Sequence, residues 1–393
     1  MVKNFVIVIP SQEKKHEICD FLSQTAQTLN NNNNLVIILQ LKESYSIKEI
    51  LVSLFHNKKI IKLVGKKNGI YYIKPLFIIP FRRFEFIYNL NLKINCLLLQ
   101  VFIEITNHHK KKLLWMFFPH EEKLTSYFGE RWFILYDIVD FYTLPTKKEN
   151  QLLEIKKKKL LKKSHLTTAI SNSLKIKYSK LTNKKIYQVP QGFQLIKNKP
   201  PIKNRKRNKK KQKPIIGYIG HINNRFDLKL LKGLMSKNIQ WNFVFVGPKH
   251  HDNNISYQDQ SIKINDLFKL KNVFWVKEQP KKNISKFISK FDICIIPYDT
   301  KYNFNKFCYP MKLFEYFSIG KPVISTPIQE LLLPKFKDII RIGKNHEEWE
   351  NHINNIILNN WTQKQKEKQN KMSLNNSWEH KIKKISSLIV NHL

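Results

Sequence analysis

Residues 309–326 (YPMKLFEYFSIGKPVIST) have the residue types to bind a phosphate and a sugar diol side by side. The pattern predicts a loop, a short helix that contains Glu315, a helix-ending Gly320 and a buried strand. The first backbone N–H groups of a helix are unpaired and can bind an anion. Glu315 lies about one turn further along, where its carboxylate can accept hydrogen bonds from two ribose hydroxyls. The segment therefore predicts a site for a nucleotide-sugar.

Two other segments precede it in an order and spacing that fit the same kind of site. Residues 215–227 (IIGYIGHINNRFD) predict a strand and a glycine turn, and residues 292–298 (DICIIPY) predict the strand that leads into the loop before Glu315. Together the three segments resemble the donor domain of GT-B glycosyltransferases of the group 1, or family 4, type. The resemblance covers residues 214–345 and implies a nucleotide-sugar donor.

Sugar transfer from such a donor requires positive charge near the diphosphate leaving group, and two cations are placed to supply it. Arg225 follows the glycine turn and can bind a phosphate through its guanidinium. Lys312 is in the first turn of the helix, where the helix dipole disfavours a cation unless an anion lies nearby. Gly220 lets the backbone approach the ligand closely, and His221 could contact the donor. In a chain this basic, each cation could equally be a solvated surface residue.

The N-terminal half contributes two aspartates at the end of another expected strand. Residues 136–142 (YDIVDFY) resemble the Tyr-Asp-x-Val-Asp-Asp motif of a bacterial branch involved in cell-surface polysaccharide synthesis, including teichuronic acid transferases, although Phe141 replaces its last aspartate. The resemblance makes Asp140 the first candidate for the base that deprotonates or orients the acceptor, with Asp137 second. The alternative is that Asp137 caps a turn and Asp140 is structural.

Three more residues are candidates for the acceptor side. His120 ends residues 115–120 (WMFFPH), which are similar to another strand end of that branch, and Arg82 and Arg83 follow an apolar run. The two arginines could bind a lipid phosphate or simply face water. Together with the basic helix expected over 150–164, which has an apolar edge, they could form a surface for an anionic membrane. A solvated charged helix is the alternative.

One position departs from the pattern of many retaining members of the family. These enzymes carry a second glutamate eight positions before the ribose glutamate, and here that position is Phe307. The resemblance therefore implies neither retention nor inversion, and it leaves room for a divergent or inactive member. No acidic pair with metal-ligand spacing stands out in the sequence. We therefore expect no metal ion and no cofactor, with the nucleotide-sugar bound as a substrate.

Short apolar runs alternate with helical patterns along most of the chain, which is typical of α/β domains. We expect strands over 5–9, 35–39, 70–73, 113–117, 133–136, 215–219, 242–247, 273–276, 292–297 and 322–325. Helices are expected over 14–29, 84–106, 148–164, 227–237, 281–290 and 310–319, followed by a helical tail in which Ser377 is an N-cap. The resemblance implies the GT-B fold: two doubly wound Rossmann-like domains face a central cleft, and a C-terminal helix crosses back to the N-terminal domain.

A run of Lys and Arg over residues 197–213 predicts the domain boundary. Apolar residues are nearly absent from this run and like charges repel, so no core can form there. We expect an exposed linker between an acceptor-side domain, residues 1–196, and a donor domain, residues 214–360. Residues 361–393 are expected to pack back toward the N-terminal domain. A phosphate-binding or membrane-binding arm is the alternative for the linker.

The net charge of +41 is the outlier of the composition. Such a charge can attract nucleic acid, an anionic membrane or an acidic substrate, but the codon bias of an AT-rich genome explains it equally well. Nucleic acid is the least favoured partner because no RNP, KH or zinc-knuckle motif is present. Scattered cysteines, no signal peptide and no long uncharged apolar run predict a cytoplasmic protein that is soluble or peripherally attached to the inner face of the cytoplasmic membrane.

The resemblance as a whole implies a glycosyltransferase that moves a sugar from a nucleotide-sugar donor to a glycan or lipid-linked acceptor in cell-surface polysaccharide synthesis. A nucleotide-sugar epimerase or hydrolase on the same fold is the nearest alternative, and dependence on an acceptor would separate the two. A degenerate, non-catalytic GT-B protein and a basic nucleic-acid-binding protein are the others. The sequence does not indicate the sugar, the nucleotide base, the acceptor or the oligomeric state.

Overall fold

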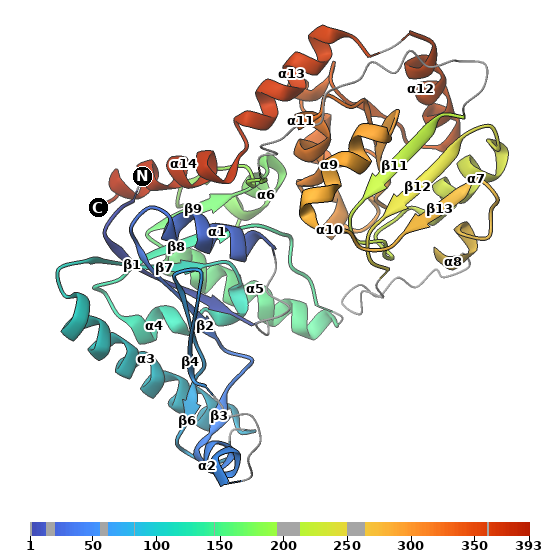
Figure 1. Ribbon diagram of the computed structural model, residues 1–393. Helices are drawn as coiled ribbons and strands as arrows, with labels where there is room; N and C mark the ends of the chain where they lie inside the picture. The colour runs from blue at the N-terminus through green and yellow to red at the C-terminus, as the bar shows by residue number, and fades with distance from the viewer. Residues whose placement is uncertain are drawn as a thin grey trace.

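The computed structural model describes residues 2–12, 20–55, 62–81, 83–144, 146–194, 213–249, 264–359 and 361–393. Two β-sheets, each accompanied by helices, form two halves of the molecule that lie side by side (Figure 1). In both sheets the chain starts in the middle, fills one side and then returns to fill the other. Because parallel crossovers are right-handed, this reversal places helices on both faces of a sheet, which is the doubly wound arrangement.

The N-terminal sheet has the strand order β10-β9-β8-β7-β1-β2-β5-β4, and its described pairs are parallel except for β4 with β5. Every residue of β1 and of β8 is buried, as expected for central strands covered on both faces. A separate two-stranded sheet pairs β3 with β6. The strands are β1 Phe5–Ser11, β2 Leu35–Gln40, β3 Tyr45–Ser46, β4 Val64–Lys67, β5 Ile70–Ile73, β6 Leu76–Phe77, β7 Lys111–Met116, β8 Phe133–Ile138, β9 Leu166–Ala169 and β10 Ile186–Gln188.

The helices of this half connect successive strands and cover the sheet. Helix α5 begins with a capping box in which Thr146 and Glu149 bond reciprocally to each other's backbone N–H. Helix α3 lies along the outer edge of the domain, away from the other half (Figure 1). The helices are α1 Asp20–Asn30, α2 Ile47–Phe55, α3 Glu85–Asn107, η1 Pro119–Glu121, α4 Leu124–Phe128, α5 Lys147–Lys163 and α6 Asn172–Ser179.

The C-terminal sheet has the order β13-β12-β11-β14-β15-β16, and all its described pairs are parallel. Its strands are β11 Ile215–Ile219, β12 Asn242–Val246, β13 Val273–Val276, β14 Ile293–Ile296, β15 Val323–Ser325 and β16 Arg341–Ile342. Its helices are α7 Leu228–Lys237, α8 Ile264–Leu267, α9 Lys281–Lys290, α10 Asn303–Lys306, α11 Lys312–Ser318, η2 Gln329–Leu332, η3 Pro334–Phe336 and α12 His346–Asn359.

Two helices at the end of the chain connect the halves. Helix α13 (Gln363–Leu374) packs on α11 of the C-terminal half, whereas α14 (Trp378–Val390) packs on α1 and β9 of the N-terminal half. The turn between them is tied to the segment after β10, because Phe193 N donates to Asn376 O at 3.0 Å and Trp378 N donates to Phe193 O at 3.3 Å. The expected N-cap is confirmed, since the Ser377 side chain accepts from His380 N.

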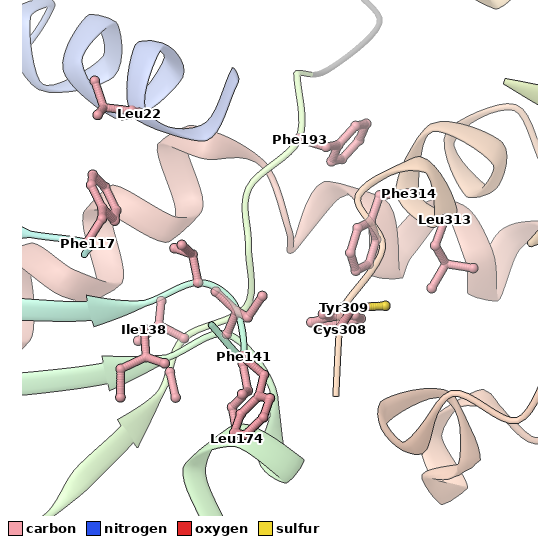
Figure 2. Packing of buried hydrophobic residues seen from close by; sticks show 14 of the residues in the cluster. Leu22, Phe117, Ile138, Phe141, Leu174, Phe193, Cys308, Tyr309, Leu313 and Phe314 are labelled. Carbon is pink, nitrogen blue, oxygen red and sulfur yellow. The ribbon is translucent and has the colours of Figure 1, made fainter. Parts of the chain in front are cut away.

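The buried hydrophobic side chains of both halves belong to one cluster. Figure 2 shows where the halves approach each other, with Phe193 facing Phe314 of α11, and the ring centroids of this pair are 5.9 Å apart. Cys308 and Tyr309 lie at the same junction, opposite Phe141 of the N-terminal half. The strand ends that carry the candidate site residues therefore meet across a packed apolar contact.

The α/β class, the doubly wound halves and the returning C-terminal helix are confirmed. Each strand expected from the sequence is present and its ends differ by no more than two residues from the prediction. The expected helix over 14–29 is described only from Asp20, because residues 13–19 lie outside the described part. Residues 197–212 also lie outside the described part of the chain, so the basic linker and the domain boundaries stay predictions.

Candidate functional site

The glycine turn after β11 brings the backbone of two strands into direct contact. Gly220 has a φ of +128°, and its N–H donates to Val246 O at 3.0 Å. Gly247, just after β12, has a φ of +144°, and a Cβ at this position would lie 2.1 Å from Gly220 O. A Cβ at Gly220 would lie 3.1 Å from Lys312 Cε. Both glycines are therefore required by conformation and by space, and Gly220 adjoins the predicted donor lysine.

We expect Gly247→Ala to lower the free energy of unfolding by more than about 3 kcal/mol. The left-handed conformation alone costs a residue with a Cβ about 1–2 kcal/mol, and the overlap with Gly220 O adds to this cost. Gly129→Ala is the matched control, because Gly129 has a φ of +72° but its Cβ would have no neighbour within 4 Å. Urea unfolding of both variants measures the difference, and equal losses would show that the contact between the turns is unimportant.

Arg225 is held by contacts from two loops of the donor domain. Its Nε donates to Asn305 Oδ1 at 2.8 Å, and Asn305 Nδ2 donates back to Arg225 O at 3.0 Å. The guanidinium carbon lies 4.3 Å from the centre of the Tyr298 ring and 4.5 Å from that of Phe304. Aromatic stacking and a buried amide fix a planar guanidinium while leaving donors for a ligand.

Lys312, the first residue of α11, points toward the carboxyl ends of β11 and β14. Its Nζ donates to the Tyr298 hydroxyl and lies 4.8 Å from the ring centres of both Tyr218 and Tyr298. Burial alone would raise the pKa of Tyr298, but the charges of Lys312 and Arg225 outweigh burial and lower this pKa. The two predicted diphosphate cations thus share one aromatic residue, and they concentrate positive charge at the strand ends.

Glu315 lies three residues after Lys312, on the same side of α11. It is partly exposed, whereas the flanking Phe314 and Tyr316 are fully buried. Tyr316 fixes the helix against β11, because its hydroxyl accepts from Ile219 N at 3.0 Å. The chain therefore presents Gly220, Lys312 and Glu315 at one end of the sheet.

Asp140 of the N-terminal half and Arg225 of the C-terminal half interact across the junction. Burial raises the pKa of Asp140 to about 6, and the positive charge of Arg225 opposes that shift. Cys308 lies within reach of both charges, and burial raises the pKa of its thiol to about 11. The charge of the Asp140 carboxyl, which changes near pH 6, therefore acts on the predicted phosphate-binding cation across the domain interface.

Asp137, the second candidate base, is engaged on both carboxylate oxygens. Oδ1 accepts from Thr168 Oγ1 at 2.8 Å, and Oδ2 forms an ion pair with Lys381 Nζ at 2.8 Å. Lys381 also donates to Gln191 Oε1 at 2.6 Å, and both charged side chains are fully buried. Burial lowers the pKa of Lys381, and Asp137 opposes that shift. This geometry favours a structural role, in which Asp137 anchors α14 to the N-terminal sheet.

The two positions that depart from the family pattern pack against each other. Phe141 replaces the last aspartate of its motif and Phe307 replaces the upstream glutamate, and their ring centroids are 5.4 Å apart. Lys177 Nζ lies 4.0 Å from the Phe141 ring centre and 4.7 Å from that of Phe307. These two positions therefore form an aromatic pair, one ring from each side of the junction, that carries a cation.

A buried carboxylate provides a second contact between the halves. Glu330 of η2 accepts from Asn172 N at 2.7 Å and from Gln188 Nε2 at 3.0 Å, and both of these donors belong to the N-terminal half. Lys335, which belongs to the same half as Glu330, forms an ion pair with this carboxylate at 2.8 Å. Asn172 is the first residue of α6, so the carboxylate lies where the helix dipole favours negative charge.

The remaining predicted residues lie further from this junction or outside the described part. His120 is in η1 after β7, and burial together with the charges of Lys156 and Lys157 lowers its pKa. His221 is exposed, and its carbonyl accepts from the Tyr218 hydroxyl at 2.9 Å. Arg83 is exposed before α3, with its guanidinium 5.1 Å from the Phe84 ring centre, and Arg82 lies outside the described residues.

Sequence reasoning missed two residues that organise the donor side. Tyr298 ends a segment that was recognised as a strand, so its place at the carboxyl end of β14 could have been inferred. Asn305 gave no signal, because only the folded loops show that it bonds both Arg225 and the carbonyl of Asp299. A cavity of about 330 Å³ beside Tyr309, lined by lysines of α13 and α14, includes none of the predicted donor residues.

The side chains that could bind a metal ion are those of aspartate, glutamate, histidine and cysteine. Within the described ranges, no group of three such residues could hold a metal ion. The positive groups near the donor side are Arg225 and Lys312, which can neutralise phosphate charge themselves. That the protein works without a metal ion stays a proposal.

Two doubly wound domains that meet at their strand ends, with a helix returning to the first domain, define a protein of the GT-B class. Residues 201–376 match the family described as glycosyl transferases group 1. The resemblance seen in the sequence is thereby confirmed.

Individual relatives agree with this assignment. The chain is 28% identical over 227 residues to TuaH of Bacillus subtilis, which is named as a teichuronic acid biosynthesis glycosyltransferase. This match covers 54% of the chain, and it spans only about half (55%) of that relative's length.

Solved structures match over nearly the whole chain and show the fold. HepE of Anabaena in complex with UDP has a TM-score of 0.65 at 13% identity, with 98% of this chain and 100% of that chain covered. Sucrose-phosphate synthase from Thermosynechococcus elongatus has a TM-score of 0.65 at 13% identity, with 98% of each chain covered. A glycosyltransferase from Rickettsia africae has a TM-score of 0.64 at 15% identity, with 100% and 99% covered.

Proposed function

We propose that the protein transfers a sugar from a nucleotide-sugar donor to a glycan or lipid-linked acceptor in cell-surface polysaccharide synthesis. One observation carries the proposal: within a group 1 domain, Gly220, Arg225, Lys312 and Glu315 gather at the strand ends, and Asp140 of the other domain interacts with Arg225. Cations, a diol acceptor and a titratable carboxyl are the groups that this reaction requires.

In the proposed reaction, Arg225 and Lys312 bind the diphosphate and stabilise the negative charge that develops on it as the bond to the sugar breaks. Glu315 accepts hydrogen bonds from the ribose hydroxyls. Asp140, in its charged form, takes the proton of the acceptor hydroxyl. Because Asp140 and Arg225 belong to different domains, donor and acceptor are brought together only when the domains meet.

The proposed acceptor is based on the name of a relative, and the proposed location is based on the net charge of the chain. The relative TuaH is named for teichuronic acid biosynthesis, and this name supports a glycan or lipid-linked acceptor. His120 and Arg83 remain the candidate acceptor-side residues. We place the reaction at the inner face of the cytoplasmic membrane, where the charge of +41 would favour contact with anionic lipid.

Donor binding tests the proposal directly. The protein is titrated by calorimetry with UDP, GDP, dTDP and ADP and with their common sugar conjugates. We expect saturable binding of one nucleotide family and an affinity about 10- to 100-fold lower in Glu315→Ala, because hydrogen bonds to a charged group contribute about 1.5–3 kcal/mol. Glu347→Ala is the matched control, since Glu347 is an exposed carboxylate in the first turn of α12.

The outcomes separate the proposed function from its alternatives. Absence of binding to every nucleotide would overturn the active transferase and leave a non-catalytic GT-B protein. Binding followed by turnover without any acceptor would indicate a hydrolase or an epimerase. Equal affinities of Glu315→Ala and Glu347→Ala would move the donor site away from α11.

A further inference from the structure

Helix α3 lies along the outer edge of the N-terminal domain (Figure 1), and it exposes a row of large apolar side chains. Phe86 and Ile105 are each 76% exposed, although both are large hydrophobic residues. We call the set the α3 face; its members are Phe86, Leu97, Leu98, Val101, Phe102 and Ile105. Their spacing places them on one side of the helix. A contiguous apolar surface of this kind is uncommon on a soluble monomer and marks an interaction site.

The opposite side of the same helix is already used by the fold. Leu92, Cys96, Leu99 and Ile103 are buried in the hydrophobic cluster of the molecule. The α3 face is therefore not the core-facing stripe of a displaced helix. It is a second apolar side, and a helix that is apolar on both sides requires a second apolar environment.

Among the described helices, α3 is the one that is long and apolar enough to cross a membrane. Its polar side chains exclude that arrangement. Asn91 bonds both the N–H and the carbonyl of Ile79, Asn95 does the same with Leu76, and Gln100 donates to Tyr127 O at 2.9 Å. Withdrawal of α3 from the domain would break these bonds, so the helix can meet a membrane only lengthwise, in its plane.

Basic residues border the α3 face, and the two acidic residues of the helix itself are paired. Glu85 forms an ion pair with Lys123 at 2.7 Å, and Glu104 forms one with Lys112 at 2.6 Å. Further exposed cations lie before, within and after the helix: Arg83, Lys93 and Lys111. Arg131 also contacts Glu104, at 3.5 Å. An apolar strip bordered by positive charge is complementary to anionic lipid. Two copies of this chain would instead bring like charges together at the same strip.

We propose that the α3 face docks onto the surface of an anionic bilayer, with α3 in the membrane plane and its outer side chains among the lipid headgroups and upper acyl chains. Helix α2, at the tip of the same domain (Figure 1), exposes Ile47, Leu51 and Val52 and would extend the contact. The docking extends the proposed function by giving it a membrane partner. It does not depend on sugar transfer, because the surface lies apart from Asp140 and Arg225.

Sedimentation of the full-length protein with vesicles tests the docking. The vesicles contain either phosphatidylcholine alone or phosphatidylcholine with about one third phosphatidylglycerol. We expect binding to the anionic vesicles and a roughly 100-fold weaker partition for the double variant Leu97→Glu/Val101→Glu, which removes two large apolar groups from the contact. The matched control is Ile239→Glu/Leu358→Glu, which changes two hydrophobic residues of the C-terminal domain that are at least as exposed as Leu97 and Val101.

Two further readouts decide the other outcomes. The chain has seven tryptophans of its own, so the fluorescence of the wild-type protein is subtracted from that of Phe102→Trp. The difference should shift to the blue on anionic vesicles and be quenched by lipids brominated on their acyl chains. The proposal would be overturned if both double variants sedimented equally with anionic vesicles, or if the fluorescence of the introduced tryptophan did not shift. It would also be overturned if the protein formed a dimer without lipid and Leu97→Glu/Val101→Glu abolished that dimer. Calorimetry with nucleotides on the same variants keeps the two proposals apart, because α3 variants should retain full donor affinity.

Discussion

Replacement of Asp140 by asparagine should lower kcat by about 10²- to 10⁴-fold, the usual contribution of a general base. Asparagine keeps the size of the side chain and its contact with the junction, but it cannot take a proton from the acceptor hydroxyl. Initial rates with saturating donor and acceptor measure the loss. Asp338→Asn is the control, because Asp338 is an exposed carboxylate paired with Lys368 on the surface. A loss below tenfold in Asp140→Asn would assign the base to another residue.

The pH dependence gives this variant a distinctive signature. Burial raises the pKa of Asp140 to about 6, so the charged base accumulates as pH rises through 6, and kcat should rise with it and then level off. The folded-state pKa lies above the ordinary value of 3.8, so the folded protein holds this proton more tightly than the unfolded chain does. Stability should therefore fall as pH rises from about 4 to about 6. In Asp140→Asn both effects should vanish, and the variant should be more stable than the wild-type protein at pH 8.

Replacement of Lys381 by methionine should lower the free energy of unfolding by about 3–5 kcal/mol, the usual cost of leaving one charge of a buried pair without its partner. Asp137 would remain buried with only the Thr168 hydroxyl as a partner, and Gln191 would lose a donor. Chemical denaturation measures the loss. Lys383→Met, an exposed lysine of the same helix, is the matched control.

A double variant tests whether the loss arises from the pair. If Asp137 and Lys381 act together, Asp137→Asn combined with Lys381→Met should cost much less than the sum of the single changes. Additive losses, or a loss in Lys381→Met no larger than in Lys383→Met, would contradict the assigned role. The same result would reopen Asp137 as a candidate base.

The sequence predicted the central strands well because these strands are almost wholly apolar runs with clear ends. It missed β9 and β10, which are only four and three residues long, and Thr167 and Thr168 interrupt the apolar pattern of β9. These two strands become recognisable through their parallel pairing with β8, which is a property of the fold. The hairpin of β4 and β5 could have been inferred, because Asn68 and Gly69 form a turn with both φ angles positive.

The candidate site was predictable within one domain and unpredictable across two. The spacing between Lys312 and Glu315 belongs to one helix, so the sequence alone indicated that they share a side. The interaction of Asp140 with Arg225 depends on how the domains meet, and no local pattern contains that information. The pairing of Asp137 with Lys381 was hidden for the same reason, because these residues are far apart in the chain and are joined only when α14 returns.

The contact of Glu330 with Asn172 has a consequence for the assembly of the two halves. The first N–H groups of a helix need an acceptor, and the acceptor for this one is supplied by the opposite domain. The first N–H of α6 therefore gains its acceptor only when the halves come together. Their separation would leave this amide bare and would leave the Glu330 carboxylate with Lys335 as its partner. Because the Glu330 carboxylate must meet the first turn of α6, this contact restricts the orientation in which the two halves can associate. It thereby helps to hold Asp140 and Arg225 on facing sides of the junction.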